Sequence, residues 1–173
     1  MTDLLKELTH YICWRTEDPA KLGATKLNKA LWFSDTIAYR LNGRSITNAA
    51  YVKRQFGPVP RRILPVLNEL HAEGKVVSRD RRRFQYTLRE LIALQPPPAS
   101  DIFSPQELEI INTVVTWICD DHTASSISEL THDCVWEAAQ DGEEIPLSAV
   151  LGAIEGEITE EDKNWASNII ATR

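Results

Sequence analysis

The stretch TKLNKALWFSDTIAYRL, residues 25–41, decides the fold class of this 173-residue chain. Its small and apolar positions recur with helical spacing at Leu27, Ala30, Leu31, Ser34, Ala38 and Leu41. The apolar surface extends around nearly the whole helix through four more side chains, Trp32, Phe33, Ile37 and Tyr39. Asn42-Gly43 then supplies a common helix stop. A helix that is apolar on nearly all sides is buried, so we expect a mainly α fold built around residues 25–41.

Two more helices are expected in the first half of the chain. Residues 3–15 carry apolar side chains at helical spacing, and the pattern ends at Pro19 because proline cannot continue a helix. Residues 56–60, FGPVP, predict a rigid turn, since glycine accepts positive φ and proline fixes φ where a helix can begin. The next helix is therefore expected from Val59 to Glu73. Residues 45–56 stay ambiguous between strand and helix because their apolar run is short.

A β-hairpin is expected near residues 75–88. Residues 75–79 and 84–88 alternate in character and flank the charged turn Asp80–Arg83. A helix followed by such a hairpin has the outline of a winged helix.

Residues 95–100, QPPPAS, predict an extended linker, because successive prolines lack amide donors. We expect a single domain over residues 1–173, with possible lobes at 1–94 and 101–173. Beyond the linker, SPQE at 104–107 combines an N-cap serine, a proline and a glutamate, and predicts a helix that continues to Asp120 or Asp121. Similar capping patterns predict helix starts at Ser126–Glu129 and Thr159–Asp162.

The composition is that of a folded soluble protein, with 43% hydrophobic and 25% charged residues. No run approaches the ~20 apolar residues that span a bilayer, and the start lacks the basic and apolar regions of a signal peptide. The three cysteines are an odd number spread along the chain, unlike a secreted disulfide framework. We therefore expect a cytoplasmic protein with no membrane contact.

The net charge of −6 hides a strong asymmetry. Residues 40–90 hold 12 basic and 4 acidic side chains, whereas residues 91–173 hold 2 and 16. This polarity either steers a partner by its long-range field or lets the two parts of the chain attract each other. We favour the second, structural interpretation.

Catalytic and metal motifs are weak in this sequence. His10 and Cys13, and Cys119 and His122, are spaced to share helix faces, but they lack the paired ligands of a zinc site. No Gly-x-Ser-x-Gly elbow and no glycine-rich phosphate loop occurs. We expect no catalytic residue, no metal and no cofactor.

A basic cluster is the strongest nucleic-acid signal. Its members are Arg79, Arg81, Arg82 and Arg83 on the expected hairpin, with Lys53, Arg54, Arg61 and Arg62 near the turn. Arginines at such positions can neutralise phosphates. Against this, the chain is acidic and the neighbouring helix offers Glu69 and Glu73 on its polar side. A protein partner, or the acidic part of the chain itself, is the alternative use of these cations.

Two blocks resemble a known family. TKLNKALWFSD at 25–35, followed by FGPV at 56–59, resembles the opening signature of the Panacea antitoxin domain. SELTHDCVWEAA at 128–139 is similar to the later signature, in which a Ser-x-x-Leu-Thr-His stretch leads to a tryptophan; here the serine is shifted, with Ser126 and Ser128 both available. In order and spacing the resemblance covers residues from about 1 to 155.

The resemblance implies a mostly helical antitoxin that neutralises a cognate toxin by direct binding, and a relative of this family resembles a protease adaptor. The signature residues that we expect to stabilise the fold are Leu27, Leu31, Trp32, Phe33, Gly57, Pro58, Val59, Leu130, Thr131 and Trp136. Lys26 and His132 are its polar members, available to a partner together with the basic cluster. Residues 79–83 and the acidic tail after Leu151 depart from the family pattern, and partner specificity is expected there.

Three functions follow as hypotheses: an antitoxin, a winged-helix-like DNA-binding regulator, and an adaptor that delivers a toxin to a protease.

Overall fold

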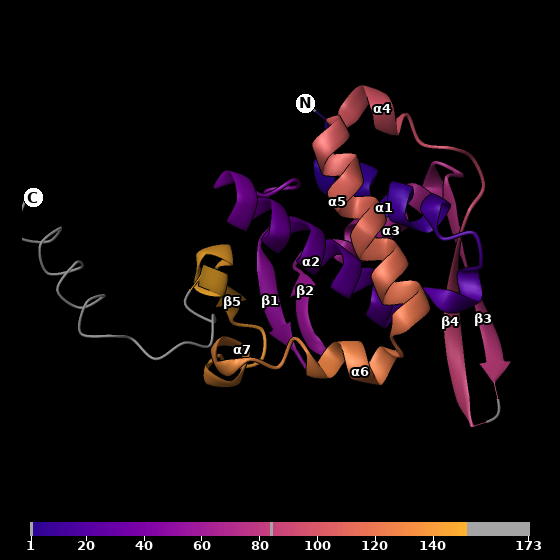
Figure 1. The fold of residues 1–173 in the computed structure, drawn as a ribbon. Helices are drawn as coiled ribbons and strands as arrows, with labels where there is room; N and C mark the ends of the chain where they lie inside the picture. Colours follow the sequence, from indigo (N-terminus) through magenta and orange to yellow (C-terminus); the bar gives the residue numbers. More distant parts are fainter. Residues whose placement is uncertain (1, 84, 152–173) are drawn as a thin grey trace, which may run out of the picture.

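The computed structural model describes residues 2–83 and 85–151, and Figure 1 shows how their helices and strands are arranged. In chain order the elements are α1 (Leu4–Arg15), the 3-10 turn η1 (Pro19–Lys21), α2 (Gly23–Asn42), β1 (Tyr51–Arg54), β2 (Gly57–Pro60), α3 (Ile63–Ala72), β3 (Val76–Arg83), β4 (Tyr86–Ala93), α4 (Ala99–Ile102), α5 (Pro105–Thr116), the short π-helix η2 (Trp117–Asp121), α6 (Ala124–Glu129), α7 (Cys134–Ala138), β5 (Glu144–Ile145) and the 3-10 turn η3 (Leu147–Leu151). The expected mainly α fold with a small hairpin is confirmed.

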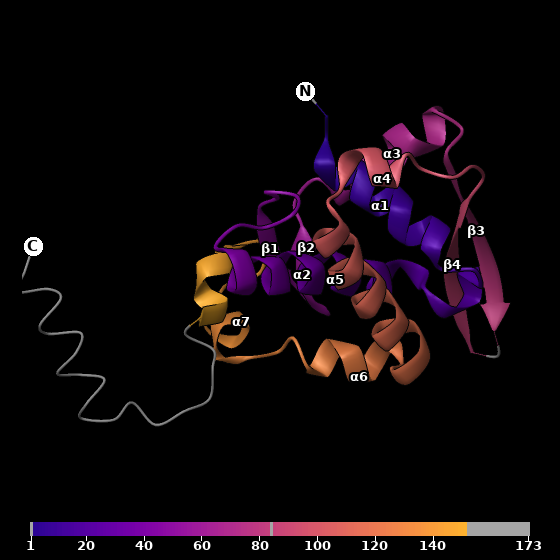
Figure 2. The same cartoon turned by 45° about the horizontal axis from the view of Figure 1, so that its top comes forward.

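The central element is α2, as its sequence predicts. It packs against α1, α5, α6, β2 and β4, and Figure 2 shows it running through the middle of the molecule. Leu27, Leu31 and Trp32 are almost fully buried. The helix ends at Gly43, whose φ of 70° is the left-handed conformation that glycine adopts without steric cost.

The other long helices also start and end close to the predicted positions. Asp3 caps α1 by accepting a hydrogen bond from the Lys6 amide at 3.3 Å. Ser104 and Glu107 form a reciprocal capping box at the start of α5, which satisfies amides that a helix N-terminus leaves unpaired. After α5 the chain continues as the short π-helix η2 to Asp121, so the predicted end is confirmed.

The extended linker predicted over residues 95–100 is shorter, because Ala99 and Ser100 belong to α4. One hydrophobic core joins the segments on either side of the Gln95–Pro98 connection. Leu8 and Ile12 of α1 share it with Ile111 of α5. Within the described ranges, no helix combines the length and hydropathy needed to cross a bilayer.

The predicted helix from Val59 to Glu73 is wrong at its start. Gly57–Pro60 forms strand β2, which pairs antiparallel with β1, and α3 begins only at Ile63. The turn falls before Gly57, at Gln55 and Phe56. Proline is tolerated here because β2 is an edge strand of the sheet β2-β1-β5. The ambiguous stretch 45–56 therefore contains a strand, Tyr51–Arg54.

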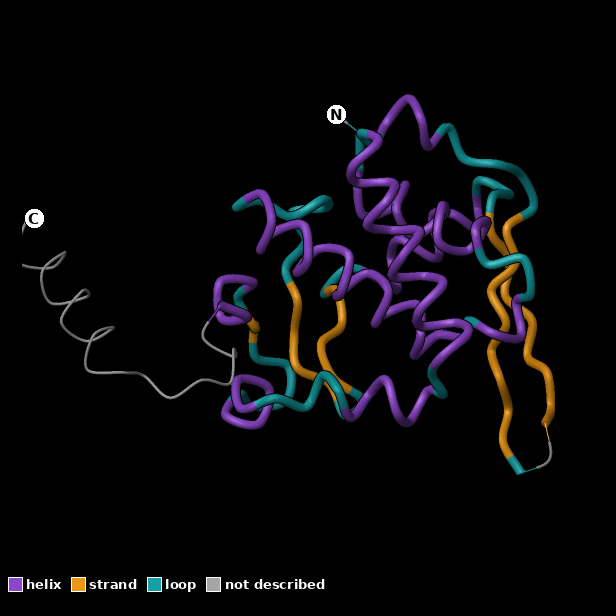
Figure 3. Tube along the Cα trace, viewed as in Figure 1, coloured by secondary structure: helices purple, strands orange, loops and turns teal. Residues whose placement is uncertain are grey.

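The hairpin is present but longer than predicted. Asp80–Arg83, expected as the turn, belongs to strand β3 and pairs with Tyr86–Arg89 of β4. Opposite charges face each other across the ladder, Arg79 with Glu90 and Asp80 with Arg89, and such cross-strand pairs stabilise a longer ladder. Figure 3 shows the two strands extending beyond the helical body.

The capping box expected at Ser126–Glu129 is also wrong. The box is formed by Thr123 and Ser126, so α6 begins three residues earlier, at Ala124. A separate helix, α7, follows with Asp133 as its N-cap. The helix start predicted at Thr159–Asp162 lies outside the described residues.

Candidate functional site

A buried lysine connects three distant parts of the chain. Lys29 of α2 is 1% exposed, and its Nζ donates a hydrogen bond to the Phe56 carbonyl oxygen in the turn between β1 and β2. It forms no ion pair with any residue that the structure describes. Burial disfavours the charged amine and lowers the pKa of Lys29 to about 7. The sequence analysis did not select Lys29, although a lysine inside an otherwise buried helix was the available signal.

Gly57 is the second member of this contact. Its φ of 105° favours glycine, and a Cβ at this position would overlap both Lys29 Nζ and Thr131 Oγ1. The Thr131 hydroxyl is directed by its own hydrogen bond to the Ser128 carbonyl at 2.8 Å. Helix α2, the β1–β2 turn and the segment after α6 therefore meet at one point, which we call the junction.

The last signature block extends the junction through Trp136. The His132 and Trp136 rings are stacked, with centroids 3.8 Å apart and planes 11° from parallel. Lys53 Nζ lies 4.1 Å from the centre of the Trp136 ring and donates to the Ala139 carbonyl at 2.8 Å. Trp136 Nε1 donates to the Arg54 carbonyl at 3.2 Å. These contacts attach α7 to strand β1.

The imidazole ring of His132 has one nitrogen without a hydrogen bond. Its Nε2 is buried and has no hydrogen-bond partner among the described residues. Burial is the main cause that lowers the pKa of His132, and the nearby amines of Lys29 and Lys53 lower it further. His132 is therefore a neutral, stacked imidazole at neutral pH.

Two large apolar side chains are exposed beside the junction. Phe56 is 56% exposed and Leu130 is 54% exposed. Leu130 was expected to stabilise the fold, but it directly follows the last residue of α6, and its side chain lies at the surface and outside the core. In the chain, Phe56 directly precedes Gly57, and Leu130 directly precedes Thr131. We call Phe56, Leu130, His132, Trp136 and Lys53 the junction surface.

A second buried polar group, the carboxylate of Asp35, connects α2 to the start of strand β1. Asp35 of α2 is fully buried and accepts hydrogen bonds from the Thr47 amide at 2.8 Å, the Thr47 hydroxyl and the Tyr51 hydroxyl at 2.7 Å. Burial raises the pKa of Asp35, and these three hydrogen bonds oppose the shift. Tyr51 packs edge-on against Trp32, with centroids 4.9 Å apart. The start of β1 is thereby fixed on α2.

Several of the selected cations are bound within the molecule. Lys26 donates to the Cys119 carbonyl at 3.3 Å, and burial lowers its pKa. Arg54 pairs with Asp141 at 3.2 Å and Arg61 with Glu144 at 2.9 Å. The expected attraction between the basic and acidic parts of the chain is thus present at these two pairs.

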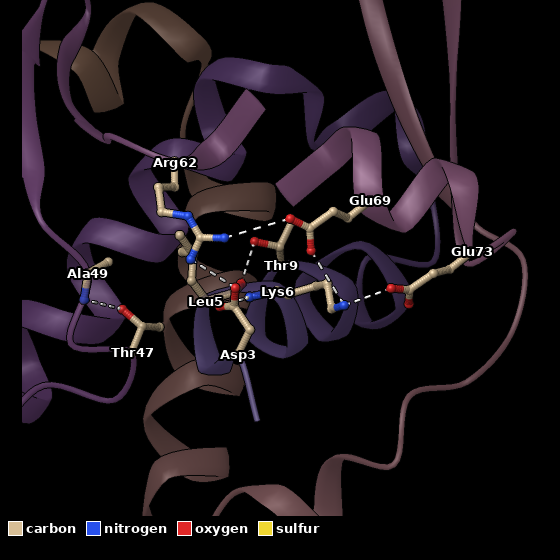
Figure 4. Close-up of polar contacts among 9 residues, drawn as sticks. All are labelled: Asp3, Leu5, Lys6, Thr9, Thr47, Ala49, Arg62, Glu69 and Glu73. Atoms are coloured by element: carbon tan, nitrogen blue, oxygen red, sulfur yellow. Dashed lines mark hydrogen bonds and ion pairs between the residues drawn. The ribbon is translucent and has the colours of Figure 1, made fainter. Parts of the chain in front are cut away.

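Arg62 lies apart from the junction, at the α1–α3 contact. It pairs with Asp3 at 3.0 Å and with Glu69 at 3.7 Å. Figure 4 shows these pairs beside Lys6, which reaches Glu73 at 2.7 Å. Arg62 thus helps to hold α1 against α3.

The hairpin arginines form a separate group on the far side of α2 from β1 (Figure 1). Arg79 and Arg81 both bind Glu90, and Arg89 binds Asp80 at 3.3 Å. Arg82 is exposed, and Arg83 makes the last backbone pair of the ladder, with Tyr86. The structure therefore does not join the two halves of the predicted basic cluster.

The cysteine and histidine pairs do not gather into a ligand set. His10 Nε2 lies 2.9 Å from the Gln95 carbonyl oxygen, and burial raises the pKa of Cys13 to about 12. In the part of the chain that the structure describes, no group of three or more metal-ligating side chains converges.

The described fold is a helical domain whose signature segments close on one another and expose a mixed apolar and cationic surface. The protein-family model of the SocA-like antitoxin Panacea domain matches residues 27–137, and the chain belongs to this family. Neither a curated protein nor a solved structure matches it. The matched range begins in α2 and ends in α7, so it contains all the elements that build the junction.

Proposed function

We propose that this protein is an antitoxin that neutralises a cognate toxin by direct binding, with the junction surface as the binding site. The family supports an antitoxin role in general. The observation that carries the site is the convergence of Lys29, Gly57 and Thr131, which come from three signature segments. The exposed residues Phe56 and Leu130 directly precede Gly57 and Thr131 in the chain.

The chemistry of the junction surface suits a protein partner. Aromatic side chains with adjacent cations are typical anchors of protein interfaces, and large exposed apolar groups gain free energy when a partner covers them. A standard interface of ~1,600 Å² extends well beyond these five side chains. The junction is packed too closely to admit a Cβ at Gly57, so little conformational entropy should be lost there on binding.

The proposed role is stoichiometric and not catalytic, and we place it in the cytoplasm. Neutralisation then depends on the amount of complex formed. An excess of toxin over this protein restores toxicity, which a catalyst would prevent.

Co-expression with the product of the adjacent gene tests the proposal. We expect growth to be rescued and the two proteins to co-purify. Phe56→Ala should weaken the complex by about tenfold or more, because it removes a central aromatic anchor. Leu41→Ala is the matched control, since Leu41 is 63% exposed and lies twelve residues beyond Lys29 on α2. Continued toxicity with both proteins soluble would contradict the proposal.

The other two hypotheses predict different results. An adaptor shortens the half-life of the toxin when a protease is present, and loses this effect in a protease-deficient host. A DNA-binding regulator retards promoter fragments, with an affinity that falls steeply as salt rises. The exposed hairpin arginines and the order of α3 followed by the β3–β4 hairpin are the observations that favour the regulator.

A further inference from the structure

The β3–β4 hairpin is a cationic arm on an acidic protein. Residues 76–93 hold five arginines and two acidic residues, in a chain of net charge −6. Residues 78–82 are exposed, and so is Tyr86, at 60%. The strands project from the helical body (Figures 1 and 3).

Glu90 organises two of these arginines from beneath. Its side chain is 1% exposed, whereas those of Arg79 and Arg81 are 61% and 54% exposed. One Glu90 oxygen accepts from Arg79 Nε and Nη2 at 3.0 and 2.6 Å, and the other accepts from Arg81 Nη1 at 3.2 Å. These hydrogen bonds, Arg79 first, hold the pKa of Glu90 below its usual value. The carboxylate is therefore ionised at neutral pH and fixes both guanidinium groups.

The fixed guanidinium groups keep donors for a second ligand. A guanidinium has about five N–H donors; Arg79 uses donors on two nitrogens and Arg81 on one. Alternate residues of a strand point to the same face, so Arg79 and Arg81 share the face that carries Leu88 and Tyr86 across the ladder. Both groups are ordered before any partner arrives, which removes part of the entropic cost of binding.

We propose that Arg79 and Arg81, held by Glu90, bind carboxylate side chains on an acidic surface of the toxin. This inference rests on the proposed antitoxin function and adds a second, charge-selective contact to it. The planar guanidinium fork matches a carboxylate in a bidentate manner. Tyr86, which is 60% exposed on the same face, adds an aromatic group that suits a protein surface, whereas Leu88 packs inward near Gly23.

A nucleic acid fits this arm less well. The neighbouring helix α3 exposes Leu64, Asn68 and His71 and carries the acidic Glu69. The net charge of the whole chain is −6, which disfavours binding of a polyanion in general.

Two arginine-to-lysine substitutions in the full chain test the inference, because they preserve charge and remove the fork. Binding to the purified product of the adjacent gene is measured at low and physiological salt. We expect Arg81→Lys to weaken the complex by about tenfold. Arg89→Lys, on the opposite face of the same hairpin, should leave the affinity unchanged.

Glu90→Gln distinguishes binding by two guanidinium groups held in place from a general long-range attraction to the positive charge of the arm. It raises the formal charge of the arm by one, so a purely long-range attraction predicts tighter binding. The inference predicts weaker binding, by about fivefold, because the two guanidinium groups lose their anchor. Thermal unfolding checks that the variant is folded; if it is not, the comparison of Arg81→Lys with Arg89→Lys decides.

Each outcome has a distinct meaning. If the wild type binds and Arg81→Lys binds equally well, the inference is overturned and the antitoxin function stands. If the wild type does not bind at all, both fall. A random-sequence DNA duplex is the second probe: if the wild type binds it at physiological salt and Arg81→Lys does not, the arm is a phosphate site and the inference is overturned.

Discussion

The junction and the hairpin arm each bury one ionisable side chain, but its sign and its partners differ between the two regions. At the junction the amine is buried, and among the described residues Lys29 has only the neutral Phe56 carbonyl oxygen as its partner. On the arm the anion is buried, and Glu90 is covered by two exposed arginines. Burial of a charge without a counter-ion is costly and shifts its pKa toward the neutral form, whereas a paired carboxylate stays charged. The junction therefore holds a structural amine, and the arm presents charge to the outside.

Among the substitutions that test this contrast, Gly57→Ala is expected to have the largest effect. The added Cβ meets Lys29 Nζ and Thr131 Oγ1 at a φ of 105°, so we expect a loss of about 3 kcal/mol in the free energy of unfolding. Gly43→Ala is the control, because its φ of 70° is also left-handed but no atom lies within 4 Å of the added Cβ. It should cost about 1 kcal/mol. Equal losses, measured by urea unfolding, would show that the junction is not tightly packed.

The pH dependence of stability tests the buried amine. The pKa of Lys29 is about 7 in the folded protein, whereas the ordinary value, which applies to the unfolded chain, is 10.5. Between these two pH values the unfolded chain therefore binds more protons than the folded protein. Stability from this group therefore rises with pH through that window and is flat below it. Between pH 7 and 9 we expect wild-type stability to gain roughly 2 kcal/mol over Lys29→Met. Parallel pH profiles of the two proteins would contradict a neutral Lys29.

Trp136→Ala removes a smaller set of contacts on the outer side of the junction. It deletes the stack on His132, the contact with Lys53 and the hydrogen bond to Arg54. We expect a loss of about 2 kcal/mol, because Trp136 is only half-buried. Trp14→Ala, at a tryptophan that is 45% exposed on α1, should cost under about 1 kcal/mol. Chemical unfolding followed by circular dichroism provides the comparison.

The smallest effect is expected for the exposed pair on the arm. Asp80 and Arg89 are 3.3 Å apart and both are 60% exposed, so solvent screens their attraction. Asp80→Asn should change the free energy of unfolding by at most about 0.5 kcal/mol, and the change should vanish at high salt. A larger, salt-independent loss would mean that the face of the hairpin that carries Asp80 and Arg89 is packed and not solvated.

Local patterns predicted the long helices well. The bounds of α1, α2 and α5 agree with the sequence, because apolar periodicity and the caps at Gly43 and Ser104 act within a few residues. The two errors at β2 and at the hairpin turn have a common cause. Gly57–Pro60 and Asp80–Arg83 become strands only because a partner strand pairs with them, and that pairing is not visible in either segment alone.

The candidate site was predicted only in part. Gly57, Thr131, His132 and Trp136 were selected through the family resemblance, whereas Lys29, which meets Gly57 and Thr131, was missed. A lysine in a helix is normally solvated, and nothing in its own segment indicates a carbonyl partner 27 residues away. Glu90 was missed for the same reason, since its burial depends on the elements that pack around the hairpin.

The sequence by itself determined a mainly helical family member with a central apolar helix, a basic middle and an acidic end, because these follow from composition and short-range periodicity. Only the tertiary structure decided which charges are buried and which face outward. That outcome depends on desolvation and on contacts between residues far apart in the chain, as at Lys29 with Phe56 and Lys53 with Ala139.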